Sequence, residues 1–204
     1  MQASLSMTLT HSHEQTETQA DEARQLGFWF YLMSDGVIFA LLFATYAAMS
    51  HSFAGGPSGK ELFDIRYTLA ETALLLTSSL TCGLATLAAL QQRRNQAVVW
   101  LLMTLVLGLS FVALELSEFG DMIGQGAGPE RSGYLSAFFT LVGTHGLHVS
   151  LGMVWLLVMV AQLLRKGTRF QVLSRLQRWA LFWHFLDIVW VGIFSVVYLP
   201  GVLP

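Results

Sequence analysis

The sequence predicts an all-α membrane protein, a bundle of five transmembrane helices. Of its 204 residues, 54% are hydrophobic and 12% are charged, which is roughly half of the charged fraction usual in soluble proteins. Five windows reach the length of about 20 apolar residues that spans the hydrocarbon core. They must be helices, because unpaired backbone groups cannot face lipid. The windows are 28–49, 68–90, 98–119, 134–164 and 179–198.

Polar and turn-forming segments separate these windows. The segment 1–27 is polar and lacks the apolar core of a signal peptide, so we expect it to be a mobile cytoplasmic tail. Later breaks carry glycine, proline or clustered polar residues, which end helices. No internal repeat is evident, and residues 28–204 are therefore expected to form one transmembrane domain. The breaks lie at 54–59, 91–95, 124–129 and 165–178.

The distribution of basic residues predicts the orientation of the chain. In a five-span protein, eight lysines and arginines fall on the side of the N-terminus and three on the other. The positive-inside rule then places the N-terminus in the cytoplasm and the C-terminus outside. The three on the outer side are Lys60, Arg66 and Arg131.

Charge and cysteine content exclude several classes of protein. The net charge of -2 gives no reason to expect a nucleic-acid partner. A single cysteine, Cys82, cannot form a disulfide within the chain and is expected to be a small packing residue.

Eight ionisable side chains fall within or at the edges of the predicted spans. Such groups are costly at bilayer depth and usually face a bundle interior, so each is a functional-site hypothesis. None is lysine or arginine, which excludes an arginine-rich voltage sensor. Because burial disfavours the charged forms, we expect a mostly neutral, hydrogen-bonded network. Its members are Asp35, Glu71, Glu115, Glu118, His145, His148, His184 and Asp187.

Helical rise, counted from the nearest basic residue, places these groups at two depths. His184 lies about 9 Å from Arg178, whereas His148 lies about 25 Å and His145 about 30 Å from Arg165. An isolated carboxyl would be costly, so Asp35 is expected to have a polar partner, with His184 as the first choice. The cytoplasmic tier is Asp35, His184 and Asp187; the outer tier is Glu71, Glu115, Glu118 and His145; His148 lies between them.

This difference in depth argues against a haem, which needs two imidazoles at one level on different helices. His145 and His148 are three residues apart on one helix and cannot take opposite faces of one ring. A metal site made by His145 with Glu115 or Glu118 is geometrically possible, but packing of polar groups across a helix interface is favoured. We therefore predict no catalytic residue, metal or cofactor in this chain, and we expect His145 to face Glu115 and Glu118.

Two further features have structural interpretations. Small and polar residues recur every fourth position along the fourth span and predict a ridge for close helix packing. The basic segment 165–178 is expected to contact anionic lipid head groups. The ridge is Ser136, Thr140, Thr144, His148 and Gly152, and the basic residues are Arg165, Lys166, Arg169, Arg175 and Arg178. Trp29, Trp100 and Trp179 lie where interfacial anchors are expected.

Two long motifs resemble a known family. The segments 138–149, FFTLVGTHGLHV, and 183–190, WHFLDIVW, are similar to the two signature stretches of subunit III of the haem-copper respiratory oxidases. The segments 72–79 and 117–119 resemble two further conserved stretches, so the resemblance covers nearly all of the chain from Phe28 onward. The five-helix length, together with 33–35 and 55–60, points to the bo-type ubiquinol oxidase branch of bacteria.

The resemblance implies a non-catalytic accessory subunit of a proton-pumping terminal oxidase. In that family the haems and copper belong to subunit I, and subunit III supports it, binds phospholipid in an intramembrane cleft and helps to sustain proton uptake. Subunits I, II and IV are then the expected partners, ubiquinone is a further candidate ligand, and the bacterial inner membrane is the expected location. Asp35 matches the position of the family's intramembrane carboxylate.

Three alternatives stay open at this point. A cytochrome c oxidase subunit III is the nearest of them. A proton-coupled transporter would use the eight ionisable groups as a relay, although no inverted repeat is evident. A membrane-embedded metal or haem enzyme is disfavoured by the difference in histidine depth.

Overall fold

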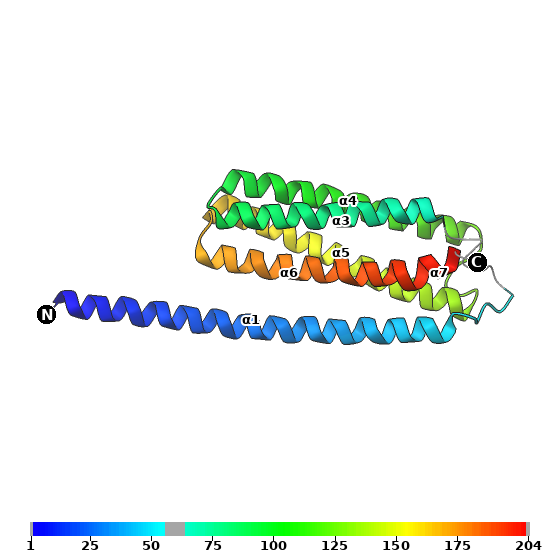
Figure 1. Cartoon of the computed structure of the whole chain (residues 1–204), viewed down its shortest axis with the longest axis horizontal. Helices are drawn as coiled ribbons and strands as arrows, with labels where there is room; N and C mark the ends of the chain where they lie inside the picture. The colour runs from blue at the N-terminus through cyan, green and yellow to red at the C-terminus, as the bar shows by residue number, and fades with distance from the viewer. Residues whose placement is uncertain (1, 56–63, 203–204) are drawn as a thin grey trace. The chain divides into compact units, whose positions relative to one another are not determined.

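Most of the part of the chain that the structure describes is helical. The computed structural model describes residues 2–55 and 64–202, with the side chains of 21–55 and 64–201, and Lys60 lies outside these ranges. The predicted fold class is confirmed, because five helices are long and apolar enough to cross a membrane and the described residues contain no strand. The helices (Figure 1) are α1 (Gln2–Met49), α3 (Ile65–Leu90), α4 (Arg94–Gly124), α5 (Gly133–Lys166) and α6 (Phe170–Ile193), followed by a π-helix, η1 (Phe194–Tyr198), and α7 (Leu199–Val202).

The structure divides into two compact units, Met1–Val37 and Ile38–Pro204. In the first unit α1 begins at Gln2, so the helix includes most of the segment that we expected to be a mobile tail. The reason is local, since glutamine, glutamate and alanine favour helix and no proline interrupts this segment. In the same unit Ser34 Oγ donates to the carbonyl oxygen of Phe30 at 2.7 Å.

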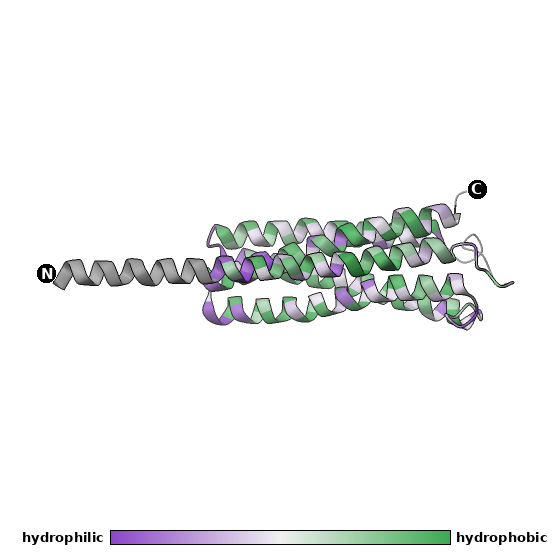
Figure 2. Ribbon diagram, turned by 90° about the horizontal axis from the view of Figure 1, so that it is seen from below, coloured by the Kyte–Doolittle hydropathy of each residue, from purple (hydrophilic) through white to green (hydrophobic). Residues whose placement is uncertain are grey.

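In the second unit α3 and α4 run side by side, and α5 and α6 complete a bundle of long helices (Figure 1). Asp64 caps α3 by accepting from the backbone N–H of Arg66 at 2.9 Å, and Ser132 caps α5 by accepting from that of Leu135 at 3.2 Å. These caps satisfy backbone donors that the first turn leaves unpaired. Figure 2 shows hydrophobic ribbon along most of these helices, with hydrophilic turns at their ends.

Tryptophan side chains of α6 fill the centre of the bundle. Trp183 lies where α4 and α5 each present a glycine: a Cβ on Gly108 would lie 3.0 Å from its ring, and one on Gly152 would lie 3.2 Å away. Trp179 is fully buried and donates from Nε1 to the carbonyl oxygen of Gly152 at 2.9 Å. It is therefore a core residue rather than the interfacial anchor that we expected.

The helix α6 begins at Phe170, so much of the segment 165–178 is helical rather than loop. A hydropathy window does not detect the first turns of α6, because their polar residues lower the mean hydropathy of the window. These residues nevertheless continue the helix. The adjoining loops are held together, since Arg94 donates to the carbonyl oxygen of Leu164 and Thr168 to the side chain of Gln92. This end of the bundle is thus closed by hydrogen bonds between its two connections.

Candidate functional site

Three glutamates from two helices form a buried cluster. Glu71 lies on α3, and Glu115 and Glu118 lie one turn apart on α4; their side chains are 0%, 2% and 9% exposed. All three interact electrostatically with one another. The structure therefore brings together the three carboxyls of the expected outer tier. We call them the glutamate cluster.

The phenol of Tyr198 joins the glutamate cluster from the end of the chain. Its hydroxyl donates to Glu118 Oε2 at 2.8 Å, and it interacts electrostatically with Glu71 and Glu115 as well. Tyr198 is fully buried and belongs to the π-helix η1, and such irregular turns recur at functional sites. Sequence periodicity could not find this residue, because a π-helix changes the register that periodicity assumes.

The carboxyl of Glu115 rests directly on the backbone of α5. A Cβ added to Gly146 would lie 2.5 Å from both of its carboxyl oxygens. Only glycine at this position leaves space for the carboxyl. The signature segment 138–149 thus supplies one wall of the glutamate cluster.

His145, next to Gly146, is enclosed by aromatic rings. Its imidazole is fully buried and lies 5.9 Å from the ring of Phe111 and 5.3 Å from that of Trp190, measured between centroids. Neither ring nitrogen has a hydrogen-bond partner among the described residues. Phe111 precedes Glu115 by one turn of α4, so His145 lies near the level of the glutamate cluster.

His148 has different surroundings, although it lies only three residues farther along α5. Its Nδ1–H donates to the carbonyl oxygen of Thr144 at 2.7 Å, and its ring lies 5.2 Å from that of Phe39. It is half-buried. The two histidines therefore do not face one common ligand.

A second polar group, the His184 group, joins α3 to α6. His184 Nδ1 lies 2.7 Å from Ser79 Oγ and 3.6 Å from Asp187 Oδ2. Ser79 is eight residues from Glu71, which is about 12 Å along the helix, so this group and the glutamate cluster occupy separate levels. Ser79 was not among the predicted site residues, because serine and threonine within an apolar helix, such as Thr77, Ser78 and Ser79, are ordinary packing residues.

Asp35 belongs to the first unit. Tyr31, one turn earlier on α1, makes a side-chain hydrogen bond to it. The spacing of four residues on a helix could have identified this partner from the sequence. The expected pairing of Asp35 with His184 would be between residues of different units, and it stays a prediction.

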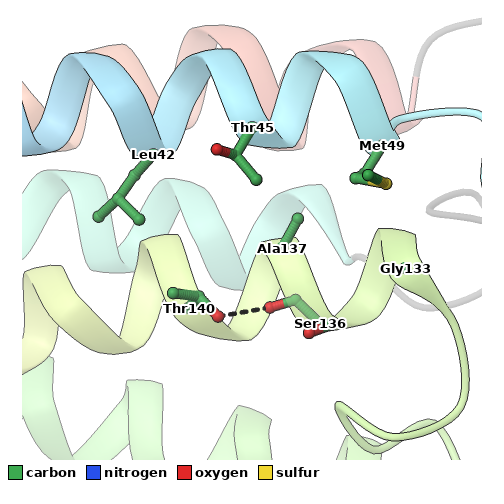
Figure 3. Close-up of a pocket in the computed structure, with 7 residues that line it drawn as sticks. All are labelled: Leu42, Thr45, Met49, Gly133, Ser136, Ala137 and Thr140. Atoms are coloured by element: carbon green, nitrogen blue, oxygen red, sulfur yellow. Dashed lines mark hydrogen bonds between the residues drawn. The ribbon is translucent and has the colours of Figure 1, made fainter.

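The polar ridge of α5 borders a small cavity of about 240 Å³. Figure 3 shows Leu42, Thr45 and Met49 of α1 opposite the start of α5. Two hydroxyls on its wall are satisfied within their own helices: Thr140 Oγ1 donates to the carbonyl oxygen of Ser136 at 2.7 Å, and Thr45 Oγ1 to that of Leu41 at 2.9 Å. The wall therefore offers mostly apolar contact. Farther along the ridge Thr144 is half-buried and Gly152 is buried.

The basic residues around the start of α6 are solvent-facing. Arg175 donates to Gln162 Oε1 at 3.1 Å, which links α6 to α5. Arg178 is half-buried. The exposed members are Arg165, Lys166, Arg169 and Arg175.

These features define a multi-pass membrane protein that buries three glutamates and His145 within the helices of its second unit. No group of three or more histidine, cysteine, aspartate or glutamate side chains that could hold a metal ion occurs in the described part of the chain. A model of the family described as cytochrome c oxidase subunit III matches residues 5–202.

Relatives agree with this match over nearly their whole length. The cytochrome bo(3) ubiquinol oxidase subunit 3 of Pseudomonas aeruginosa is 51% identical over 193 residues, which cover 95% of this chain and 92% of the relative. The protein of the same name from Pseudomonas putida is 49% identical over 87% of this chain and 86% of its own. The quinol oxidase subunit 3 of Bacillus spizizenii is 39% identical over 94% of this chain and 95% of its own.

The chain belongs to the cytochrome c oxidase subunit III family. The family resemblance seen in the two signature stretches is thereby confirmed. Membership of a subunit family implies partner subunits of an oxidase. The chain is thus a subunit of a haem-copper oxidase.

Proposed function

We propose that the chain is the accessory third subunit of a bacterial ubiquinol oxidase. Its role is to support subunit I, which carries the haems and copper, and to help sustain proton uptake by the complex. Subunits II and IV complete the assembly. The observation that carries this proposal is the identity of 39–51% with three proteins named as quinol oxidase subunits, spread over nearly the whole chain.

The distribution of side chains supports a role in assembly. Large apolar residues face outward along the helices, including Ile188, Leu80 and Val106, which are 72%, 64% and 61% exposed. Such faces need lipid or the helices of another subunit. Five of the eight predicted ionisable residues fall in the glutamate cluster and the His184 group, and these two groups are the polar sites from which proton transfer would be built.

Topology and lipid binding complete the proposal. The excess of basic residues on the side of the N-terminus, most of which lie at 93–94 and 165–178, supports an N-terminus in the cytoplasm and a place in the inner membrane. The exposed arginines and Lys166 suit anionic head groups, and the apolar cavity between Leu42 and Thr140 suits part of an acyl chain. Ubiquinone is a second candidate ligand of the apolar surfaces.

Copurification tests this proposal. The tagged chain, extracted from bacterial membranes with a mild detergent, should bring down a larger polypeptide that carries haem and copper. The purified complex should oxidise ubiquinol with oxygen, whereas oxidation of cytochrome c would indicate the other branch of the family. An unrelated tagged multi-pass protein from the same membranes serves as control.

Recovery of the chain alone, free of any haem-bearing polypeptide, would contradict the proposal. Solute uptake by vesicles that contain only this chain would instead favour the proton-coupled transporter.

A further inference from the structure

The buried carboxyl of Glu71 lacks hydrogen-bond partners among the described protein groups. The side chain is fully buried, and the lack applies to both of its carboxyl oxygens. A buried polar group without a hydrogen bond is costly, by about 1–3 kcal/mol in proteins. Glu71 interacts electrostatically with Glu118 and Glu115, the other members of the glutamate cluster.

The neighbouring groups do not solve this problem. Glu115 Oε1 is also buried and without a partner in the described part of the chain. The hydroxyl of Tyr198 donates to Glu118. Glu71 on α3 and Glu115 on α4 thus both keep buried carboxyl oxygens that no described protein group satisfies.

We propose that the glutamate cluster encloses an internal water-binding site, in which ordered water donates hydrogen bonds to Glu71 and Glu115 and bridges α3 to α4. Buried water commonly occupies polar sites that offer it two to four partners, and Glu71, Glu115 and Glu118 provide them. Water is favoured over a metal ion, because the described residues contain no group of carboxylates and histidines arranged to hold one.

The burial of the surrounding residues bounds this site. Glu118 is its least buried member, at 9% exposure. Beside it, the hydroxyl of Tyr67 lies 2.6 Å from Ser117 Oγ at the surface of the α3–α4 pair. One turn farther into the bundle, Leu75 and Phe111 are buried and apolar. The site thus ends before the His184 group, and Glu118 is its member nearest the surface.

Radiolytic labelling of the intact oxidase tests the site, because hydroxyl radicals formed from bound water by X-ray pulses oxidise side chains beside that water. Tyr198, although fully buried, should be labelled severalfold faster than Trp183, which is equally buried and donates to Ser78. Glu71→Met should slow the labelling of Tyr198 severalfold and leave that of Trp183 unchanged. Glu71→Gln, which keeps polar atoms at this position, should retain most of the labelling.

Equal labelling of Tyr198 and Trp183 in the wild-type oxidase would overturn the proposal, and this comparison needs no variant to assemble. Labelling of Tyr198 that is insensitive to Glu71→Met would also overturn it. So would a density map of the oxidase that shows an ion held by Glu71 and Glu115 at distances of about 2.0–2.6 Å, as metal cations require.

Discussion

Trp183→Ala should destabilise the bundle by about 3–5 kcal/mol, the usual cost of emptying the space of a buried tryptophan. The side chain of Trp183 is 1% exposed. Its ring meets Gly108 of α4 and Gly152 of α5, and its Nε1 donates to Ser78 Oγ of α3 at 3.0 Å. Packing of this kind drives helix association in membranes, where hydrophobic burial gives no advantage. One side chain therefore joins four helices.

The midpoint temperature of heat-induced aggregation in detergent measures this loss. We expect a decrease on the order of 10 °C for Trp183→Ala. Ile188→Ala is the matched control, because Ile188 lies on the same helix and is 72% exposed; it should change the midpoint little. A midpoint for Trp183→Ala equal to that of the control would show that the contacts of Trp183 with the three other helices contribute nothing.

Gly146→Ala should destabilise the protein by about 1–3 kcal/mol, as overpacking does. The added methyl group would lie 2.5 Å from both carboxyl oxygens of Glu115. Glu115 is buried, so its carboxyl can move only by disturbing the glutamate cluster. Gly143→Ala is the control on the same helix, since its Cβ would meet Phe119 at an ordinary 3.7 Å, and alanine favours helix over glycine by up to about 1 kcal/mol.

A second substitution identifies the cause of the Gly146 effect. If the clash is with the carboxyl, Glu115→Ala should recover part of the stability that Gly146→Ala loses, whereas the equally large Glu115→Gln should not. The double-mutant cycle, measured by the same thermal midpoints, isolates the coupling of the two sites. Additive effects of Gly146→Ala and Glu115→Ala would refute the clash.

The positions of the helices could be predicted from the sequence, because apolar windows near 20 residues fit only one structure in lipid. The two signature stretches identified the family, because they are long and specific. Helix ends were less predictable. The start of α6 at Phe170 follows a polar turn, and hydropathy alone assigns such a turn to the loop.

The candidate site was only partly predictable. Helical rise separated the glutamate cluster from the His184 group, because depth depends on residue number alone. Residue number does not give rotation about the helix axis, and so it could not show that Glu115 rests on Gly146 or that Ser79 bonds His184. Tyr198 was missed because the π-helix turns its side chain to a face that no regular period would give.

The central claim is that this chain supports a metal-bearing partner and carries no metal itself. The direct measurement is to remove the chain from the purified oxidase with a harsher detergent and to count haem, iron and copper in both fractions. We predict that all of the haem and copper stays with the remaining subunits. Stoichiometric haem or copper in the fraction that holds this chain would contradict the claim.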